Sequence, residues 1–335
     1  MNMLAQWNGI TDNIIVHLLT SLIYIIGANF VFDMQLSVGS VFAFITYSAY
    51  VTGPISAILN IGYLLSGIIP STKRYYEFMA LEEEKENEEG MTEPCFGDLE
   101  LQNLSFSYEK DKAVLSDINI AFPKGSKTVL IGRNGSGKST LISLLLQLYQ
   151  PTGGKITLNG IDISEFVLRE YRNMISVVSQ EIYLFNSSIR DNICMYKSID
   201  DKTIMEACKD SGLADFISEV SLDYVVGQNG AMLSEGQKQK IALARALVHN
   251  SPVIIFDEAT SNTDVYSEHQ INGLLHTKLK EKTVIIITHK QEILKEADQI
   301  IMLKDGAVVG SGVYDDLSKD NLEFKNMLKM GENIE

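Results

Sequence analysis

A glycine-rich segment between a predicted strand and a predicted helix constrains the fold of this 335-residue chain more than any other feature. Residues 128–131 (TVLI) are an apolar run typical of a buried strand, and residues 140–148 have helical character. Residues 132–139 between them read GRNGSGKS and match the pattern G-x-x-x-x-G-K-[ST]. Because glycines let backbone N–H groups and a helix N-terminus surround an anion, this order predicts an α/β fold with a phosphate-binding loop.

Side chains of this loop indicate the chemistry. Lys138 offers a positive charge to the β- and γ-phosphates of a nucleoside triphosphate, and the Ser139 hydroxyl is a ligand for Mg²⁺. The residues of the loop that we predict to contact the nucleotide are Gly132, Arg133, Asn134, Gly135, Ser136, Gly137, Lys138, Ser139 and Thr140.

A second apolar run, residues 253–256 (VIIF), ends in Asp257 and Glu258. A carboxylate at the carboxyl end of a strand beside a phosphate loop is placed to hold Mg²⁺ through water, which we predict for Asp257. The carboxylate of Glu258 could polarise an attacking water as a general base. An apolar run followed by Asp-Glu is common, so its weight depends on the residues between it and the glycine loop.

Residues 233–237 read LSEGQ and are followed by an amphipathic helical pattern over residues 238–247. Here the sequence resembles the ABC ATPase family, whose signature reads LSGGQ ahead of such a helix. The resemblance implies that ATP is bound with Mg²⁺ between two ABC subunits, identical or different. Ser234, Gly236 and Gln237 of one copy would then close over the γ-phosphate bound by the other.

The resemblance assigns further residues by order and spacing. Tyr108 matches the aromatic ring that stacks on adenine, and Gln180 matches the loop glutamine that senses Mg²⁺ and faces the membrane domain. Asp264 matches the D-loop aspartate and His289 the switch histidine at the γ-phosphate. Any one of these alone would more often be an ordinary surface residue. The implied catalytic set is Glu258, His289, Gln180 and Asp264, and the implied Mg²⁺ set is Ser139, Gln180 and Asp257.

The chain departs from the family pattern at two positions. Glu235 stands where the commonest signature has glycine. A carboxylate near a triphosphate is repulsive unless its side chain points away or finds a cation. The D-loop reads Ser-Asn-Thr-Asp over residues 261–264 instead of Ser-Ala-Leu-Asp, and it keeps the aspartate. We expect function with a changed rate or affinity.

The front of the chain is long and uncharged. Residues 14–32 carry no formal charge if His17 is neutral, and as a helix they would span about 28 Å, close to the hydrocarbon thickness of a bilayer. A polar break at residues 33–37 precedes a second uncharged stretch that ends at Lys73 and Arg74. These basic residues predict that the rest of the chain is cytoplasmic. A buried hairpin in a soluble protein and a secretory signal are the alternatives, disfavoured by the length and by the lack of a basic start.

We therefore predict a partial transmembrane domain over residues 1–80, with helices at 14–32 and 38–72, in a multi-pass plasma-membrane protein. An acidic linker would cover 81–98. The ABC ATP-binding domain would cover 99–335, with a mainly parallel core sheet, a small antiparallel β portion around Tyr108 and a helical subdomain at about 187–249. A last helix near residues 314–330 would cap the domain. The net charge of −15 argues against a nucleic-acid partner, and the cysteine spacing fits a reducing compartment.

Residues 1–80 resemble the last two of the six membrane helices in exporters of the multidrug, lipid and peptide type. The chain thus resembles the C-terminal portion of a half-transporter, and the resemblance implies an ATP-hydrolysing subunit that drives export. The alternatives are a remnant that binds nucleotide without coupling to transport and a non-transport ABC ATPase. The transported substrate is not predictable from this sequence, since specificity in this class lies in the membrane helices.

Overall fold

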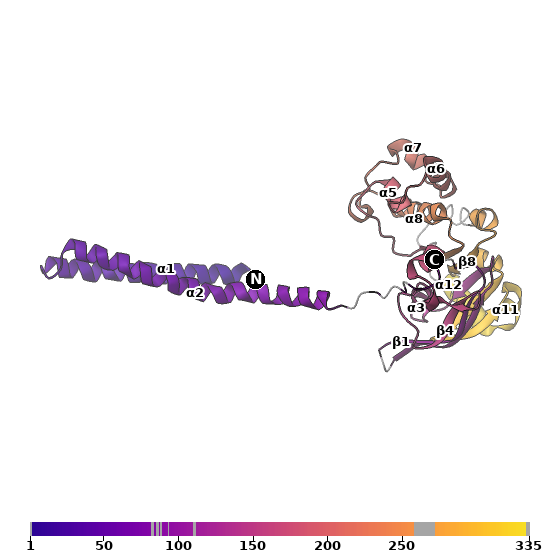
Figure 1. Cartoon of the computed structure of the whole chain (residues 1–335), viewed down its shortest axis with the longest axis horizontal. Coiled ribbons are helices and arrows are strands. Elements are labelled where there is room, and N and C mark those ends of the chain that lie inside the picture. The colour runs from indigo at the N-terminus through magenta and orange to yellow at the C-terminus, as the bar shows by residue number, and fades with distance from the viewer. Residues whose placement is uncertain are drawn as a thin grey trace. The chain divides into compact units, whose positions relative to one another are not determined.

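The structure is a computed structural model that describes residues 2–81, 84, 87, 89–92, 94–109, 112–257 and 272–332. It divides into two compact units, Met1–Glu84 and Lys85–Glu335, which are described separately (Figure 1).

The first unit is a helical hairpin. Helix α1 (Asn2–Phe32) and helix α2 (Val38–Met79) lie side by side (Figure 1). The side chain of Ser37 caps α2 by accepting a hydrogen bond from the backbone N–H of Ser40 at 3.1 Å. Helix α2 continues through Pro54 and Pro70. It ends at Met79, so the helical segment is longer than the predicted 38–72.

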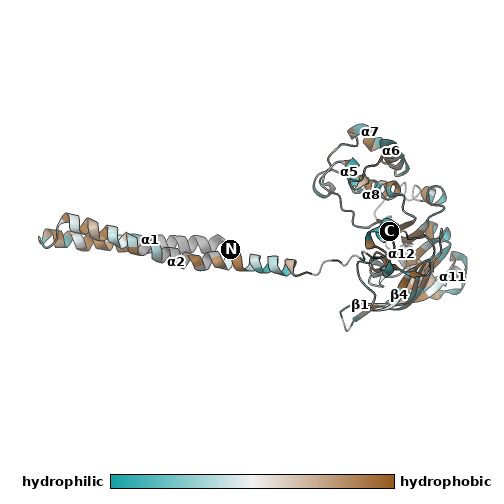
Figure 2. Cartoon of the chain, viewed as in Figure 1, coloured by the Kyte–Doolittle hydropathy of each residue, from teal (hydrophilic) through white to brown (hydrophobic). Residues whose placement is uncertain are grey.

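Many large apolar side chains of this hairpin are exposed, among them Leu18, Phe42 and Tyr50. Figure 2 shows hydrophobic residues along much of both helices. Within the part of the chain that the structure describes, none of the helices combines the length and the apolar character that a membrane crossing requires.

The second unit is built on a mostly parallel sheet. The strand order is β10-β9-β3-β8-β7-β6, in which β9 and β10 are antiparallel and the other neighbours are parallel. Strands such as β7 and β8 are apolar almost throughout because both faces of the sheet are buried, with alternate residues of each strand in two different apolar cores. The strands are β3 (Lys127–Ile131), β6 (Ile175–Val178), β7 (Val253–Asp257), β8 (Thr283–Ile287), β9 (Gln299–Lys304) and β10 (Ala307–Gly312).

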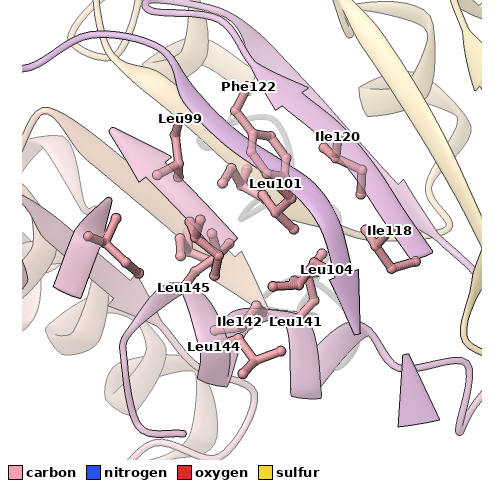
Figure 3. Close-up of a cluster of buried hydrophobic side chains, with 14 of the residues drawn as sticks. Leu99, Leu101, Leu104, Ile118, Ile120, Phe122, Leu141, Ile142, Leu144 and Leu145 are labelled. Atoms are coloured by element: carbon pink, nitrogen blue, oxygen red, sulfur yellow. The ribbon is translucent and has the colours of Figure 1, made fainter. Parts of the chain in front are cut away.

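A smaller antiparallel sheet has the order β2-β1-β4-β5. The first helix of the domain, α3 (Lys138–Leu145), packs against it through a shared apolar core. Figure 3 shows Leu141 and Leu145 of α3 facing Leu101 and Leu104 of β1. The strands are β1 (Leu99–Glu109), β2 (Lys112–Phe122), β4 (Gly153–Leu158) and β5 (Ile161–Asp162), and the short helices after β5 are η1 (Ile163–Glu165) and α4 (Leu168–Asn173).

Between β6 and β7 the chain forms a helical subdomain. Its elements are α5 (Ile189–Cys194), α6 (Asp201–Asp210), α7 (Ala214–Val220), η2 (Gln228–Gly230) and α8 (Glu235–His249). Helix α8 joins this subdomain to the sheet, because its residues divide between two cores. Ala242 and Leu243 pack with the sheet, whereas Ile241 and Ala244 pack with the helical subdomain.

The C-terminal segment corrects one expectation. The sequence suggests a single helix over residues 314–330, whereas the structure has α11 (Tyr314–Asp320) and α12 (Leu322–Glu332), after a short α10 (Gln291–Lys295). Asn321 adopts an extended conformation that ends α11. Its side chain accepts a hydrogen bond from the N–H of Phe324 at 3.0 Å and so starts the next helix.

Candidate nucleotide-binding site

The glycine loop runs from β3 into α3, and its backbone requires glycine at two positions. Gly137, with φ of 102°, lies in a region that side chains rarely adopt, and a Cβ there would stand 2.5 Å from Leu115 Cδ2. A Cβ at Gly132 would clash with the carbonyl oxygen of Leu303, which is backbone and cannot move aside. The loop conformation therefore depends on packing against distant parts of the domain.

Polar groups line the inside of this loop. The buried ammonium of Lys138 donates hydrogen bonds to the carbonyls of Gly132 (2.7 Å) and Arg133 (3.1 Å). Ser136 is 4% exposed, and among the described residues its hydroxyl has no hydrogen-bond partner. A buried hydroxyl without a partner is rare in proteins, and a phosphate oxygen would supply one. These groups fit a polyphosphate.

The C-terminal end of α3 is also held in place, by hydrogen bonds from side chains of α4. The hydroxyl of Tyr171 donates to the carbonyl of Leu145 at 2.7 Å, and Arg172 donates to the carbonyls of Leu146 (2.9 Å) and Gln147 (3.1 Å). Burial raises the pKa of Tyr171, so the phenol stays protonated as a donor. These bonds satisfy carbonyls that the end of a helix leaves without partners.

Several predicted site residues come directly after the carboxyl ends of neighbouring parallel strands. The register pairs Leu130 of β3 with Ile287 of β8, and Ile287 with Asp257 of β7. The glycine loop, Asp257 and the segment that holds His289 therefore leave the sheet at the same edge. Gln180 lies two residues after β6, which pairs with β7 up to Val178 and Phe256. Ligands of open parallel sheets bind at this edge.

The donor set at this edge also fits a magnesium ion. The Ser139 side chain is exposed at the first turn of α3, and Asp257 is partly buried at the end of β7. Hydroxyl, carboxylate and amide oxygens are the ligands that Mg²⁺ prefers, usually together with water and phosphate. Ser139, Gln180 and Asp257 would hold the ion.

Tyr108 belongs to an aromatic cluster beside the loop. Its hydroxyl lies 3.1 Å from the hydroxyl of Thr140 in α3. Its ring makes edge-to-face contacts with Phe106 (centroids 4.8 Å apart) and with Tyr149 (5.2 Å). Half of the Tyr108 side chain remains exposed, at 54%, so the ring is held in place and still accessible.

The signature segment starts α8. Ser234 is the N-cap, and it forms a capping box with Gln237: the Ser234 hydroxyl accepts from the Gln237 N–H (3.2 Å), and the Gln237 amide oxygen accepts from the Ser234 N–H (2.8 Å). Apart from its chain neighbours and the backbone of its own helix, no described heavy atom lies within 4 Å of where a Cβ of Gly236 would stand. The N-terminus of α8 is thus open on the Gly236 side, and a helix N-terminus favours anions.

The structure brings most predicted residues into two groups, the strand-end edge with the glycine loop and the start of α8. Arg133 and Asn134 are exposed at the tip of the loop. Glu258 and Asp264 lie outside the described residues, so their roles stay predictions.

The sequence did not predict Tyr149 or Lys238. Tyr149 reaches Tyr108 because the loop before β4 is tied to β1, where the N–H of Thr152 donates to the carbonyl of Ser105 at 2.9 Å. No pattern in the sequence signals this contact. Lys238 forms an ion pair with Glu235, with the Nζ–Oε1 distance 2.7 Å, and its spacing of three residues on a helix was the available signal.

A parallel sheet whose strand ends surround a glycine loop, a buried loop lysine and a helix after the loop defines the class of P-loop nucleotide-binding domains. Residues 115–261 match the family described as ABC transporter.

Its relatives include ATP-dependent lipid A-core flippases of Escherichia coli K12 and Shigella flexneri. Each is 34% identical over 282 residues, which is 83% of this chain and 48% of the relative. A solved structure, that of a bacterial Atm1-family ABC exporter with ATP bound, matches with a TM-score of 0.73 and 28% identity over 89% of this chain and 53% of that one. The chain spans about half the length of the curated relatives it matches. Because residues 85–335 are about three quarters of the chain, both matches include part of the helical hairpin.

Proposed function

We propose that this chain is the ATP-binding and ATP-hydrolysing subunit of an ABC exporter, and that it acts together with a second ABC subunit. One observation carries the proposal: the domain has the two complementary parts of a nucleotide site on different substructures. The glycine loop belongs to the sheet and the signature belongs to α8. A second subunit, whether identical or related, would supply its α8 N-terminus to the triphosphate held by this chain's loop.

In this proposal the resting bonds of Lys138 to loop carbonyls are exchanged for bonds to phosphate oxygens. Tyr108 stacks on adenine, and Mg²⁺, when bound, neutralises charge on the β- and γ-phosphates. Ser234, Gly236 and Gln237 of the partner present a hydroxyl, backbone N–H groups and the dipole of α8. ATP then joins the two subunits.

We assign hydrolysis to Glu258, Gln180, His289 and Asp264. Glu258 accepts the proton of a water that attacks the γ-phosphorus, and ADP is the leaving group. Gln180 and His289 orient the water and the γ-phosphate, and Asp264 contacts the opposite subunit. Loss of the γ-phosphate removes the group that the signature holds, so the subunits separate. This cycle of closing and opening would drive export.

We further propose that α1 and α2 are the two transmembrane helices of this chain, with the ATPase domain in the cytoplasm beneath a plasma membrane. Three observations support this: the uncharged sequence over residues 34–72, the exposed apolar side chains of the hairpin, and the extent of the matches to exporters. In water an apolar surface of this kind would be unfavourable, whereas lipid covers it.

The test uses the full chain in lipid nanodiscs, with Glu258→Gln and Lys138→Ala as variants. We expect Mg²⁺-dependent ATP hydrolysis that Glu258→Gln abolishes while nucleotide binding persists, and loss of binding in Lys138→Ala. The chain should be recovered in the membrane fraction of the cells that produce it. Wild-type turnover no faster than that of Glu258→Gln, despite normal binding, would favour a nucleotide-binding remnant. Recovery wholly in the soluble fraction would exclude the exporter.

A further inference from the structure

The signature of this chain contains a negative charge at its centre and a positive charge one helical turn later. Glu235 is the first residue of α8, and its carboxylate lies 2.7 Å from the ammonium of Lys238. The side chains differ in freedom: that of Glu235 is 74% exposed and that of Lys238 is 15% exposed. The partly buried cation therefore sets the position of the exposed carboxylate.

Packing explains why Lys238 is held. Its stem lies against Gly230 at the end of η2, where an added Cβ would stand 3.1 Å from Lys238 Cε. A stem fixed in this way has already lost much of its conformational freedom, so the ion pair costs less entropy than one between two mobile side chains. The ammonium thus stays beside α8 whether or not a ligand is near.

The ion pair lies where it can affect binding of the triphosphate as well as the stability of α8. Ser234 and Gly236, the residues proposed to meet the γ-phosphate, flank Glu235 on both sides. A free carboxylate there would repel the triphosphate and would also occupy the positive end of the α8 dipole.

We propose that Lys238 is a positioning residue for the ATP-closed state: it neutralises Glu235 and so makes a signature with a central glutamate compatible with the triphosphate of the opposite subunit. This inference rests on the proposed function. It assigns Lys238 no contact with the nucleotide, because its effect passes through the carboxylate of Glu235. The pair makes ATP-driven closure of this chain depend on an ion pair between its signature and the residue that follows the signature.

The test is a double-mutant cycle in ATP hydrolysis by the full chain in nanodiscs, with KM and kcat measured separately. Lys238→Met should raise the KM for ATP about tenfold, whereas Lys238→Arg should stay close to the wild type. Glu235→Gln should lower KM or leave it unchanged. The double variant Glu235→Gln/Lys238→Met should return to within about twofold of Glu235→Gln, because the charge that Lys238 neutralises is gone.

Lys304→Met is the matched control, because Lys304 forms an equally short ion pair with Glu323 (2.6 Å) away from the signature. It should leave KM unchanged. Equal KM values for Lys238→Met and Lys304→Met would overturn the inference, as would a Lys238→Met penalty that persists in the Glu235→Gln background. If the wild type hydrolyses ATP no faster than Lys138→Ala, the proposed function and this inference are both overturned. If the wild type is active but the effects of the Glu235 and Lys238 substitutions on KM are independent of each other, the inference alone is overturned.

Discussion

The glycine loop and the signature are both predicted to hold the same triphosphate, yet they obtain their shapes in different ways. The loop conformation depends on residues far away in sequence, since Gly137 packs on Leu115 and Gly132 on the Leu303 carbonyl. The signature conformation depends on neighbours, through the capping box of Ser234 and the ion pair of Glu235. One region is fixed by the tertiary core and the other by bonds within a single helical turn.

This difference indicates how each region tolerates change. At Gly132 and Gly137 the core leaves no room for an extra atom, so substitutions there should act on the fold of the site itself. A segment defined by local bonds can change a side chain while the backbone stays helical. The central glutamate of this signature is an example, because a cation three residues on accompanies it. Substitutions in and around the two regions test this difference.

The largest effect should come from Gly132→Ala in the loop. The added methyl group would clash with the Leu303 carbonyl and the loop would have to move away from the sheet. We expect ATP affinity to fall about 100-fold, measured by calorimetric titration of the full chain. Gly160→Asn is the control, because Gly160 lies outside the loop, no described atom crowds its Cβ position and asparagine tolerates its φ of 82°. Equal losses in both variants would show that the clash with Leu303 is not the cause.

A smaller effect is expected for Ser234→Ala in the signature. Loss of the N-cap should destabilise the domain by about 1 kcal/mol, and loss of the hydroxyl at the γ-phosphate should lower kcat about tenfold. Binding of ATP to the loop of a single copy should not change. Turnover assays and thermal unfolding check these outcomes.

Ser188→Ala separates the two roles of Ser234. Ser188 caps α5 in the same way, accepting from the N–H of Asp191 at 3.0 Å, and it has no proposed role at the nucleotide. The Ser188→Ala variant should lose about as much stability as Ser234→Ala and keep the ATP turnover of the wild type. If both variants lose turnover equally, the Ser234 hydroxyl has only a structural role.

Tyr149→Ala should have a modest effect on nucleotide affinity. Without its edge-to-face partner the Tyr108 ring gains freedom, which must be lost again when adenine stacks on it. We expect KM for ATP to rise about threefold with kcat unchanged, and Tyr149→Phe to behave as the wild type. An unchanged KM in Tyr149→Ala would show that Phe106 and Thr140 suffice to hold Tyr108.

The sequence predicted those parts of the fold whose signals are local. The runs at 128–131 and 253–256 appear as β3 and β7 almost to the residue, because buried parallel strands are continuous apolar segments bounded by polar ones. The single helix expected over residues 314–330 is wrong, because Asn321 can both end one helix and cap the next. For Glu235 the sequence left two possibilities open, a side chain that points away or a nearby cation, and the structure has an ion pair with Lys238.

Contacts between distant segments could not be predicted in this way. Tyr149 meets Tyr108 only because a loop is tied to β1, and Lys138 bonds to loop carbonyls only once the loop has folded around it. The convergence of Asp257 and His289 at one edge required the strand order, which a single sequence does not contain. The assigned roles of these residues stay predictions.

The smallest expected effect is on the pH dependence of stability. It concerns His249 at the C-terminal end of α8, whereas the exposed signature lies at the N-terminal end. Burial, and then the charges of Lys197 and Arg245, lower the pKa of His249. In the unfolded chain His249 binds a proton at its ordinary pKa of about 6.5, whereas in the folded chain it binds one only at a lower pH. The free energy of unfolding therefore falls as the pH drops below about 6.5. His249→Gln should remove this loss and reduce the fall in Tm between pH 7.5 and 5.5 by about 1–2 °C. Because His249 lies at the end of α8 opposite the residues predicted to contact the nucleotide, ATP turnover at pH 7.5 should be the same in both proteins. A variant whose Tm falls with pH as steeply as that of the wild type would mean that the buried end of α8 does not hold a neutral histidine.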